Sequence, residues 1–82
     1  MASVISDPNG RKRIQFVDAD GFRRTVRLGK CDLKTAEAVK VKVEMLLSAK
    51  LSGAPIPQEA AHWLGGVGQE LYEKLAHVGL AP

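Results

Sequence analysis

The sequence has few residues that could cross-link the chain or bind a metal. Cysteine occurs once, at Cys31, and histidine twice, at His62 and His77. A single thiol cannot form an internal disulfide, and two histidines fifteen residues apart do not supply a structural zinc site. We therefore expect a fold stabilised by packing alone, with no metal and no cofactor.

Long hydrophobic runs and aromatic residues are also scarce. No apolar stretch approaches the roughly 18 residues of a membrane span, and the first 13 residues lack the apolar core of a signal peptide. The 82 residues are 45% hydrophobic but include only four aromatics, so the chain can form one modest core and not two. We expect a cytoplasmic chain without a membrane partner.

The basic residues are concentrated in the first third of the chain. Residues 1–30 contain seven basic and three acidic residues, a net charge of +4, whereas residues 31–50 carry +1 and residues 51–82 carry −2. The overall charge of +3 hides this asymmetry. A basic, arginine-rich segment followed by a mildly acidic one predicts a polyanion-binding surface in the first third.

Two turn motifs divide the basic segment into strands. Asp7–Gly10 combines a proline that fixes φ with an Asn-Gly pair that tolerates positive φ, and Asp18–Gly21 ends in the Asp-Gly pair typical of hairpins. Apolar and polar residues alternate on either side of both turns. The pattern predicts three antiparallel strands over about residues 2–6, 11–17 and 22–28.

A long helix should follow the sheet and cover it. Asp32 is a suitable N-cap, and Ser52–Gly53 ahead of Pro55 predicts the end of a helix over about residues 33–51. The apolar residues that fall within one stripe, and that we expect to cover the sheet, are Leu33, Ala36, Val39, Val43, Leu46 and Leu47. A weaker apolar patch on the opposite side consists of Ala38, Val41 and Met45.

Two short helices are predicted in the last third. Pro57 suits the start of a helix over about residues 58–64, Gly65–Gly68 interrupts it, and a second helix spans about residues 69–78 with Gly79 as its cap. The residues expected to cover the weaker patch are Trp63, Leu64, Leu71 and Leu75. The predicted fold class is α+β: a three-stranded antiparallel sheet packed on one long helix, followed by one or two short C-terminal helices.

The outward side of this sheet is predicted to be basic. Alternation places Ile14, Phe16, Val26 and Leu28 toward the helix. The interleaved residues that then face outward are Arg11, Arg13, Gln15, Arg23, Thr25 and Arg27. They include four guanidinium groups and no carboxylate, together with an amide and a hydroxyl that can address base edges.

Such a surface favours double-stranded DNA as the partner, with the sheet entering a major groove. The simpler interpretation, that charged residues merely solvate an open sheet face, does not account for the lack of Asp and Glu among them. In the alternating pattern, Lys12 and Arg24 occupy positions that face the core. Both lie near strand ends, where a long side chain can reach a phosphate. We include both among the DNA-binding candidates.

The strand and turn pattern also resembles a known family. The matching segments are Ser3–Phe16 (SVISDPNGRKRIQF), Asp18–Gly29 (DADGFRRTVRLG) and Ala36–Ala38 (AEA). Together they resemble the N-terminal, arm-type DNA-binding domain of phage-integrase-like tyrosine recombinases. The resemblance covers about residues 2–50, and Phe22 and the pair Cys31–Asp32 depart from the family pattern.

The resemblance implies a module of a site-specific recombinase that acts in DNA integration. Residues 1–53 would form the sheet-plus-helix DNA-binding domain, and residues 54–82 a connector toward a core-binding domain that this chain does not contain. Catalysis would belong to a further domain with its own arginines, histidine and nucleophilic tyrosine, so we expect neither catalytic residues nor a small-molecule substrate here. Contacts between protomers of a recombinase assembly would be possible partners.

A module that binds protein is the alternative to a DNA-binding one. An exposed sheet edge or the acidic C-terminal helices could recruit a partner or a second protomer. A stand-alone enzyme is not indicated, because the sequence supplies no paired carboxylates, no nucleophile with a base and no set of metal ligands.

Several further residues have a functional and a structural interpretation, and we expect the structural one in each case. Phe22 should pack at the sheet edge, Cys31 should be an idle thiol, and His62 with Trp63 should form a helix-packing pair. The lysines that could extend a phosphate-binding surface, but are expected only to solvate the helix, are Lys34, Lys40 and Lys42.

Overall fold

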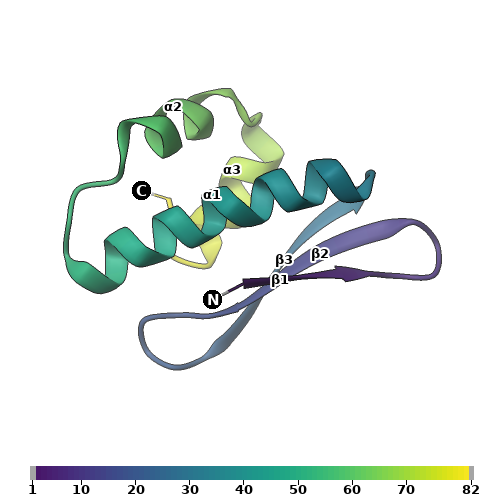
Figure 1. The fold of residues 1–82 in the computed structure, drawn as a ribbon, viewed down its shortest axis with the longest axis horizontal. Coiled ribbons are helices and arrows are strands. Elements are labelled where there is room, and N and C mark those ends of the chain that lie inside the picture. The colour runs from purple at the N-terminus through teal and green to yellow at the C-terminus, as the bar shows by residue number, and fades with distance from the viewer. Residues whose placement is uncertain (1, 82) are drawn as a thin grey trace.

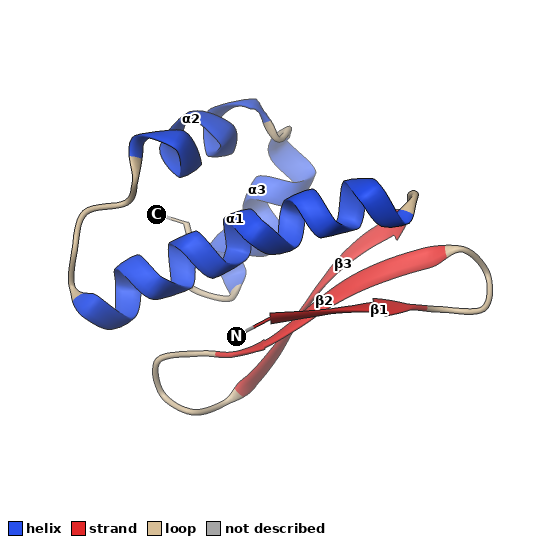
Figure 2. Ribbon diagram, in the orientation of Figure 1, coloured by secondary structure: helices blue, strands red, loops and turns tan. Residues whose placement is uncertain are grey.

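The computed structural model describes residues 2–81 and contains three strands followed by three helices (Figure 2). The elements are β1 (Ala2–Ser6), β2 (Arg11–Val17), β3 (Arg23–Lys30), α1 (Leu33–Ser52), α2 (Gln58–Gly66) and α3 (Gln69–His77). The strands form one antiparallel sheet in the order β1-β2-β3. The predicted α+β fold class, with one long helix and two short C-terminal helices, is confirmed.

The two predicted turns join the strands. In the first, the Gly10 N–H donates to the Asp7 carbonyl at 3.1 Å, and in the second the Gly21 N–H donates to the Asp18 carbonyl at 3.0 Å. Gly10 has a φ of 84° and Gly21 a φ of 85°, a region of backbone conformation that glycine enters without steric cost. The Asn-Gly and Asp-Gly pairs therefore define both hairpins, as the sequence indicated.

One extra residue in β3 changes the alternation near its end. Arg13 lies opposite Arg27, but the preceding residue, Lys12, lies opposite Gly29, so Leu28 has no partner in β2. An inserted residue shifts the two-residue period by one. Consequently Lys30, which lies opposite Arg11, belongs to the outward side of the sheet together with Arg27.

α1 covers the other side of the sheet and begins and ends at the expected residues. Asp32 caps its first turn by accepting the Thr35 N–H at 2.8 Å, and Gly53 ends it in the left-handed conformation. Five of the six predicted stripe residues are buried: Ala36, Val39, Val43, Leu46 and Leu47. The prediction for Leu33 is wrong, because this side chain in the first turn of the helix is 54% exposed.

The C-terminal helices leave two residues of the weaker patch of α1 uncovered, so that prediction is wrong for Ala38 and Val41. Val41 is 46% exposed and Ala38 is exposed, whereas Met45 is half-buried and packed against the core. Leu64 and Leu75 instead join the core formed by α1 and the sheet, with Trp63 and Leu71 packed against it. The hydrophobic effect scales with buried apolar area. The two helices therefore gain more stability by packing on this core than they would by packing on the weaker patch of α1.

The path of the chain explains how both helices reach the core. α2 continues to Gly66, two residues past its predicted end, and Gly68 then reverses the direction with a φ of 87°. In Figure 1, α1 lies between the sheet and α2, and α3 contacts β3. His62 is exposed while Trp63 is half-buried, so the predicted packing pair does not form.

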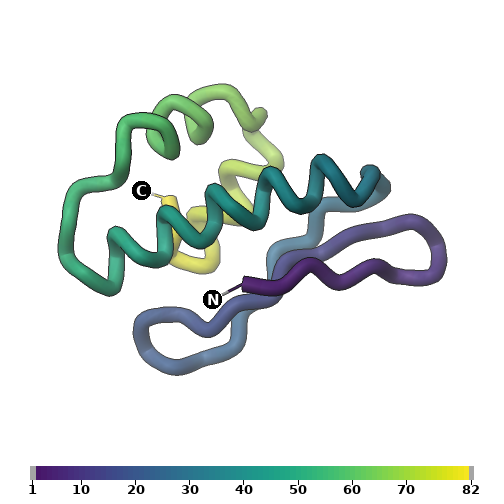
Figure 3. Tube along the Cα trace, viewed as in Figure 1, coloured from purple at the N-terminus to yellow at the C-terminus, as the bar shows by residue number. Residues whose placement is uncertain are grey.

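Polar contacts connect the last third of the chain to the rest. The Lys42 Nζ lies 2.5 Å from a Glu59 carboxylate oxygen, and the Lys50 Nζ donates to the Gly79 carbonyl at 2.7 Å. The segment that follows α3 therefore returns to α1 at Gly79 (Figure 3). The division at residues 53 and 54 stays a prediction, although the core is shared across it. No helix within residues 2–81 has the length and apolar character to cross a membrane.

Candidate nucleic-acid interface

The side of the sheet opposite α1 is termed the outer face. Its membership follows from the strand register and from the burial of Ile14, Phe16 and Val26 on the other side. The strand residues that make up the outer face are Ser3, Ile5, Arg11, Arg13, Gln15, Val17, Arg23, Thr25, Arg27 and Lys30. All six residues predicted from the sequence to face outward belong to the outer face. Lys30 also belongs to it, because the extra residue in β3 turns Lys30 outward.

Four cations of the outer face are free to meet a ligand. Arg11, Arg23, Arg27 and Lys30 are exposed. Among the contacts of residues 2–81, none of these four side chains takes part in an ion pair or a hydrogen bond. Their charges are therefore not neutralised within the described part of the protein, and exposed guanidinium groups can donate in pairs to phosphate or guanine.

Arg13 differs from the other outer-face arginines. Its side chain is 34% exposed, and its Nε lies 3.4 Å from an Asp7 carboxylate oxygen. The prediction of a face without carboxylates is therefore wrong at this point, because the first turn folds Asp7 back onto β2. The Arg13 Nε is buried and has no hydrogen-bond partner among the described residues, since the Asp7 contact is an ion pair without hydrogen-bond geometry.

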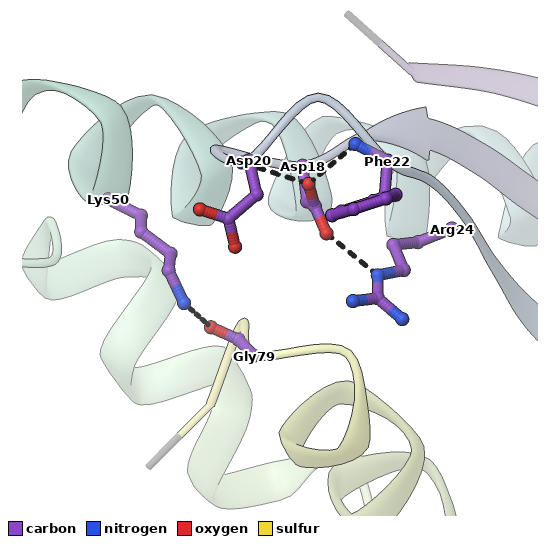
Figure 4. Close-up of polar contacts among 6 residues, drawn as sticks. All are labelled: Asp18, Asp20, Phe22, Arg24, Lys50 and Gly79. Carbon is purple, nitrogen blue, oxygen red and sulfur yellow. Dashed lines mark hydrogen bonds and ion pairs between the residues drawn. The ribbon is translucent and has the colours of Figure 1, made fainter.

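Arg24 interacts with the second turn. Its Nε donates to the Asp18 carboxylate at 2.7 Å, while the other Asp18 oxygen accepts the N–H groups of Asp20 and Phe22, each at 2.9 Å (Figure 4). The hydrogen bond from Arg24 is the main reason why the pKa of Asp18 lies below its ordinary value, and the two backbone N–H groups lower it further. The charge of Arg24 is thus paired, which reduces its value as a DNA contact.

Phe22 lies on the surface of the same turn. It is 63% exposed, and the Arg24 guanidinium carbon lies 5.8 Å from its ring centroid, within range of a cation–π contact. The expected packing at the sheet edge is therefore wrong, because β3 begins one residue later than predicted, at Arg23. The ring is available to a partner.

Lys12 lies on the side of the sheet that faces α1 and is half-buried, as the alternating pattern of β2 predicted. It is close enough to the start of α1 to influence Asp32. The hydroxyl and the backbone N–H of Thr35 lower the pKa of Asp32, and the charge of Lys12 lowers it further. Lys12 is therefore within electrostatic range of the N-cap carboxylate of α1.

Gln15 and Thr25 form the neutral centre of the outer face. They lie directly opposite each other on β2 and β3, and both are half-buried by their neighbours. Cations lie on both sides of this pair along the strands, with Arg23 toward one end and Arg27 toward the other. If the sheet entered a DNA groove with this face, the base edges would meet the hydrogen-bonding groups at the centre, and the phosphates would meet the positive charges around them.

A hollow opens at the end of the sheet that carries the first turn. Its volume is about 660 Å³, and its lining includes one carboxylate, Asp7, and five cationic side chains: Arg11, Lys12, Arg13, Arg27 and Lys74. Lys74 comes from α3 and was not predicted as a site residue. No local motif could have identified it, because it is 47 residues from Arg27 in the sequence.

The α3 side of β3 also brings acidic groups near the outer face. Glu70 and Glu73 line a second, smaller groove with Thr25, Arg27, Lys74 and His77. These carboxylates repel a polyanion at that edge. The favourable electrostatic surface therefore lies on the outward side of β2 and β3 and at the end of the sheet with the first turn, away from these two carboxylates.

The remaining sequence candidates contribute little to such a surface. The Lys42 side chain is only 16% exposed and is paired with Glu59, so it is not available to a phosphate. Lys34 is exposed and Lys40 half-buried on α1, away from the outer face. Cys31 is a half-buried free thiol. Within residues 2–81, no group of three or more His, Cys, Asp or Glu side chains is placed to hold a metal ion.

No family model matches the sequence, and no curated protein or solved structure is significantly similar to it. The arrangement of the outer face and of the hollow beside it therefore supplies the grounds for a functional proposal.

Proposed function

We propose that the chain is a DNA-binding module whose outer face enters the major groove of double-stranded DNA. The observation that carries the proposal is the set of four exposed, unpaired cations on this face, Arg11, Arg23, Arg27 and Lys30. Clusters of Lys and Arg supply most of the affinity of proteins for DNA through phosphate contacts. No carboxylate occurs on the strand positions of this face.

The dimensions of the sheet support this mode of binding. Three strands span two spacings of about 4.8 Å each, or roughly 10 Å between the outer strands. A major groove is about 12 Å wide and accepts strands of a small sheet. The second hairpin, with β2 and β3, carries most of the cations and would lie deepest.

Two classes of contact follow from the side chains. The arginines at the two ends of the face would bind phosphates or pair with guanine, whereas Gln15 could pair with adenine and the Thr25 methyl could meet the thymine methyl. Because Arg24 is already hydrogen-bonded to Asp18 in the second turn, we assign it a smaller role than the sequence suggested.

The sequence resemblance gives the proposal a more specific form. We propose that the module serves a phage-integrase-like tyrosine recombinase in the cytoplasm, where it would bind accessory DNA sites while another domain performs catalysis. The support for a recombinase module is the strand, turn and helix pattern of residues 2–50. A recombinase module would also be expected to make contacts between recombinase protomers.

Nuclear magnetic resonance of the labelled protein tests where DNA binds. Addition of a duplex should shift the backbone signals of Arg23, Thr25 and Arg27 and leave those of the exposed side of α1, such as Val41, unchanged. Shifts confined to α1 and residues 55–82 would instead reject the outer face as the interface.

A module that binds a second copy of the chain is the alternative. Apolar side chains exposed on α1 and on the following connector favour it, namely Val41 at 46%, Leu51 at 60% and Ile56 at 37%. Sedimentation at several protein concentrations distinguishes the two functions. A concentration-dependent mass, lost in Val41→Lys, would support self-association, and a constant monomer mass would exclude it.

A further inference from the structure

Two neighbouring cross-strand pairs at one end of the outer face bring like charges together. Arg13 lies opposite Arg27, and Arg11 lies opposite Lys30. Side chains directly opposite each other in an antiparallel sheet have Cβ atoms about 4.5–5.5 Å apart, and like charges in such positions repel. Of these four cations, only Arg13 has a carboxylate partner among residues 2–81. An anion placed between these pairs would convert the repulsion into attraction.

Arg13 has unused hydrogen-bonding capacity at the same place. Its Nε is buried and unpaired within the described chain, although Asp7 lies 3.4 Å away. Buried donors without a partner are rare in folded proteins. The guanidinium is thus held in position by the turn without having all its donors satisfied, and it lines the hollow together with Arg27.

Lys74 closes the hollow from α3. Its Nζ donates to the Arg27 carbonyl at 3.0 Å, which fixes the ammonium group at the edge of β3. The same Nζ lies 3.5 Å from Glu70, whose carboxylate is 88% exposed, and such an exposed ion pair is weak enough for a ligand to replace. Lys74 is the only lysine or arginine within positions 51–82 of the sequence, and its contact with the Arg27 carbonyl holds it at the cationic end of the sheet.

We infer that this hollow binds one backbone phosphate of the DNA, with Arg13, Arg27 and Lys74 as its ligands. The inference rests on the proposed function and adds α3 to the interface. Five cations against one carboxylate suit a phosphate group, and a phosphate contact fixes the register of the protein on the duplex without reading its sequence. The C-terminal helix thereby becomes an anchor for one strand.

Lys74→Gln, compared with Lys50→Gln, tests the inference. Both lysines donate to a backbone carbonyl, so both substitutions remove one charge and one similar hydrogen bond, but Lys50 lies on α1 outside the hollow. We expect Lys74→Gln to make the log–log salt dependence of duplex binding shallower by roughly 0.9 and to weaken binding roughly eightfold at about 0.1 M salt, equally for different duplex sequences. Lys50→Gln should bind like the unchanged protein.

The outcomes separate this inference from the function on which it rests. If the unchanged protein fails to bind any duplex, the proposed function is wrong. If it binds, and Lys74→Gln matches Lys50→Gln in affinity and salt dependence, the phosphate site in the hollow is wrong while DNA binding stands. Thermal unfolding of both variants must match to show that the folds are intact.

Side-chain resonances of arginine identify the source of the phosphate. A duplex should shift the Nε–Hε signals of Arg13 and Arg27, and inorganic phosphate should shift the same signals only at much higher concentration. Phosphate-induced shifts that persist unchanged when a saturating duplex is added would show that the hollow takes a free anion, which would overturn its assignment as a DNA anchor.

Discussion

Neutralising Arg27 should stabilise the protein while it weakens DNA binding. The side chain is exposed and lies opposite Arg13, with the ammonium group of Lys74 fixed at its own carbonyl. Arg27→Gln keeps the length and the polar character of the side chain but removes one of three neighbouring positive charges. A third positive charge at this position opposes folding. A gain in stability on its removal would therefore indicate that Arg27 serves binding and not folding.

The size of the gain follows from the cross-strand geometry. Opposed side chains in an antiparallel pair contribute about 0.2–1 kcal/mol, and like charges contribute with an unfavourable sign. For a domain of this length, each kcal/mol changes the melting temperature by about 4–8 °C. We therefore expect Arg27→Gln to unfold roughly 1–8 °C higher than the unchanged protein at low salt.

Thermal unfolding at two ionic strengths is the appropriate assay. The Debye length is about 10 Å at 0.1 M and about 3 Å at 1 M salt, so most of the gain should disappear at the higher concentration. Arg23→Gln is the matched control, because Arg23 lies opposite the uncharged Val17, and it should leave stability unchanged. A variant Arg27→Gln that is less stable at low salt, or a gain of equal size for Arg23→Gln, would refute the reasoning.

Three further predictions concern the fold. Leu75→Ala should lower the free energy of unfolding in urea by about 2–5 kcal/mol, because this α3 side chain is completely buried; a loss well below that range would make α3 peripheral. Gly79→Ala should lower the free energy of unfolding by about 1–2 kcal/mol, because Gly79 has a φ of 83° and an added Cβ would lie 2.8 Å from the Lys50 Nζ. The control Gly65→Ala, within α2, should be neutral or stabilising. Equal losses of stability in the two variants would contradict this explanation. The pKa of Asp18 is lowered from 3.8, chiefly by Arg24, so its stabilising effect is present above the unfolded-state pKa and is lost as the pH falls through the lower folded-state value. Asp18→Asn should therefore unfold with a weaker pH dependence between about pH 5 and 2, and an unchanged dependence would be inconsistent with the pairing.

Local signals explain why the strands and α1 could be predicted. The glycines at positions 10 and 21 adopt the positive φ that their turns require, and Asp32 and Gly53 define the two ends of α1 through contacts within a few residues. These elements depend on chemistry that is adjacent in the sequence. Their boundaries in the structure accordingly differ from the predicted ones by only one or two residues.

Long-range contacts explain what the sequence could not reveal. The position of α3 beside β3 depends on burial of Leu75 and Leu80 in the shared core. Nothing in the alternation of β3 indicates the extra residue at Leu28, which transfers Lys30 to the outer face.

The same limit applies to the candidate site. Alternation correctly assigned six residues to the outer face, but it could not indicate that Asp7 would turn back onto Arg13 or that Lys74 would reach Arg27 from α3. A sequence pattern thus predicts which way a strand side chain faces. It does not predict the partners that neighbouring turns and helices supply.

Titration of a labelled duplex at several salt concentrations tests the central claim most directly. If the outer face contacts five to seven phosphates, the log–log plot of affinity against salt should have a slope of about −4.5 to −6.3. The combined replacement of Arg11, Arg23 and Arg27 by Gln should make this slope shallower by roughly 2.7. Absent binding, or an affinity independent of salt, would contradict the account.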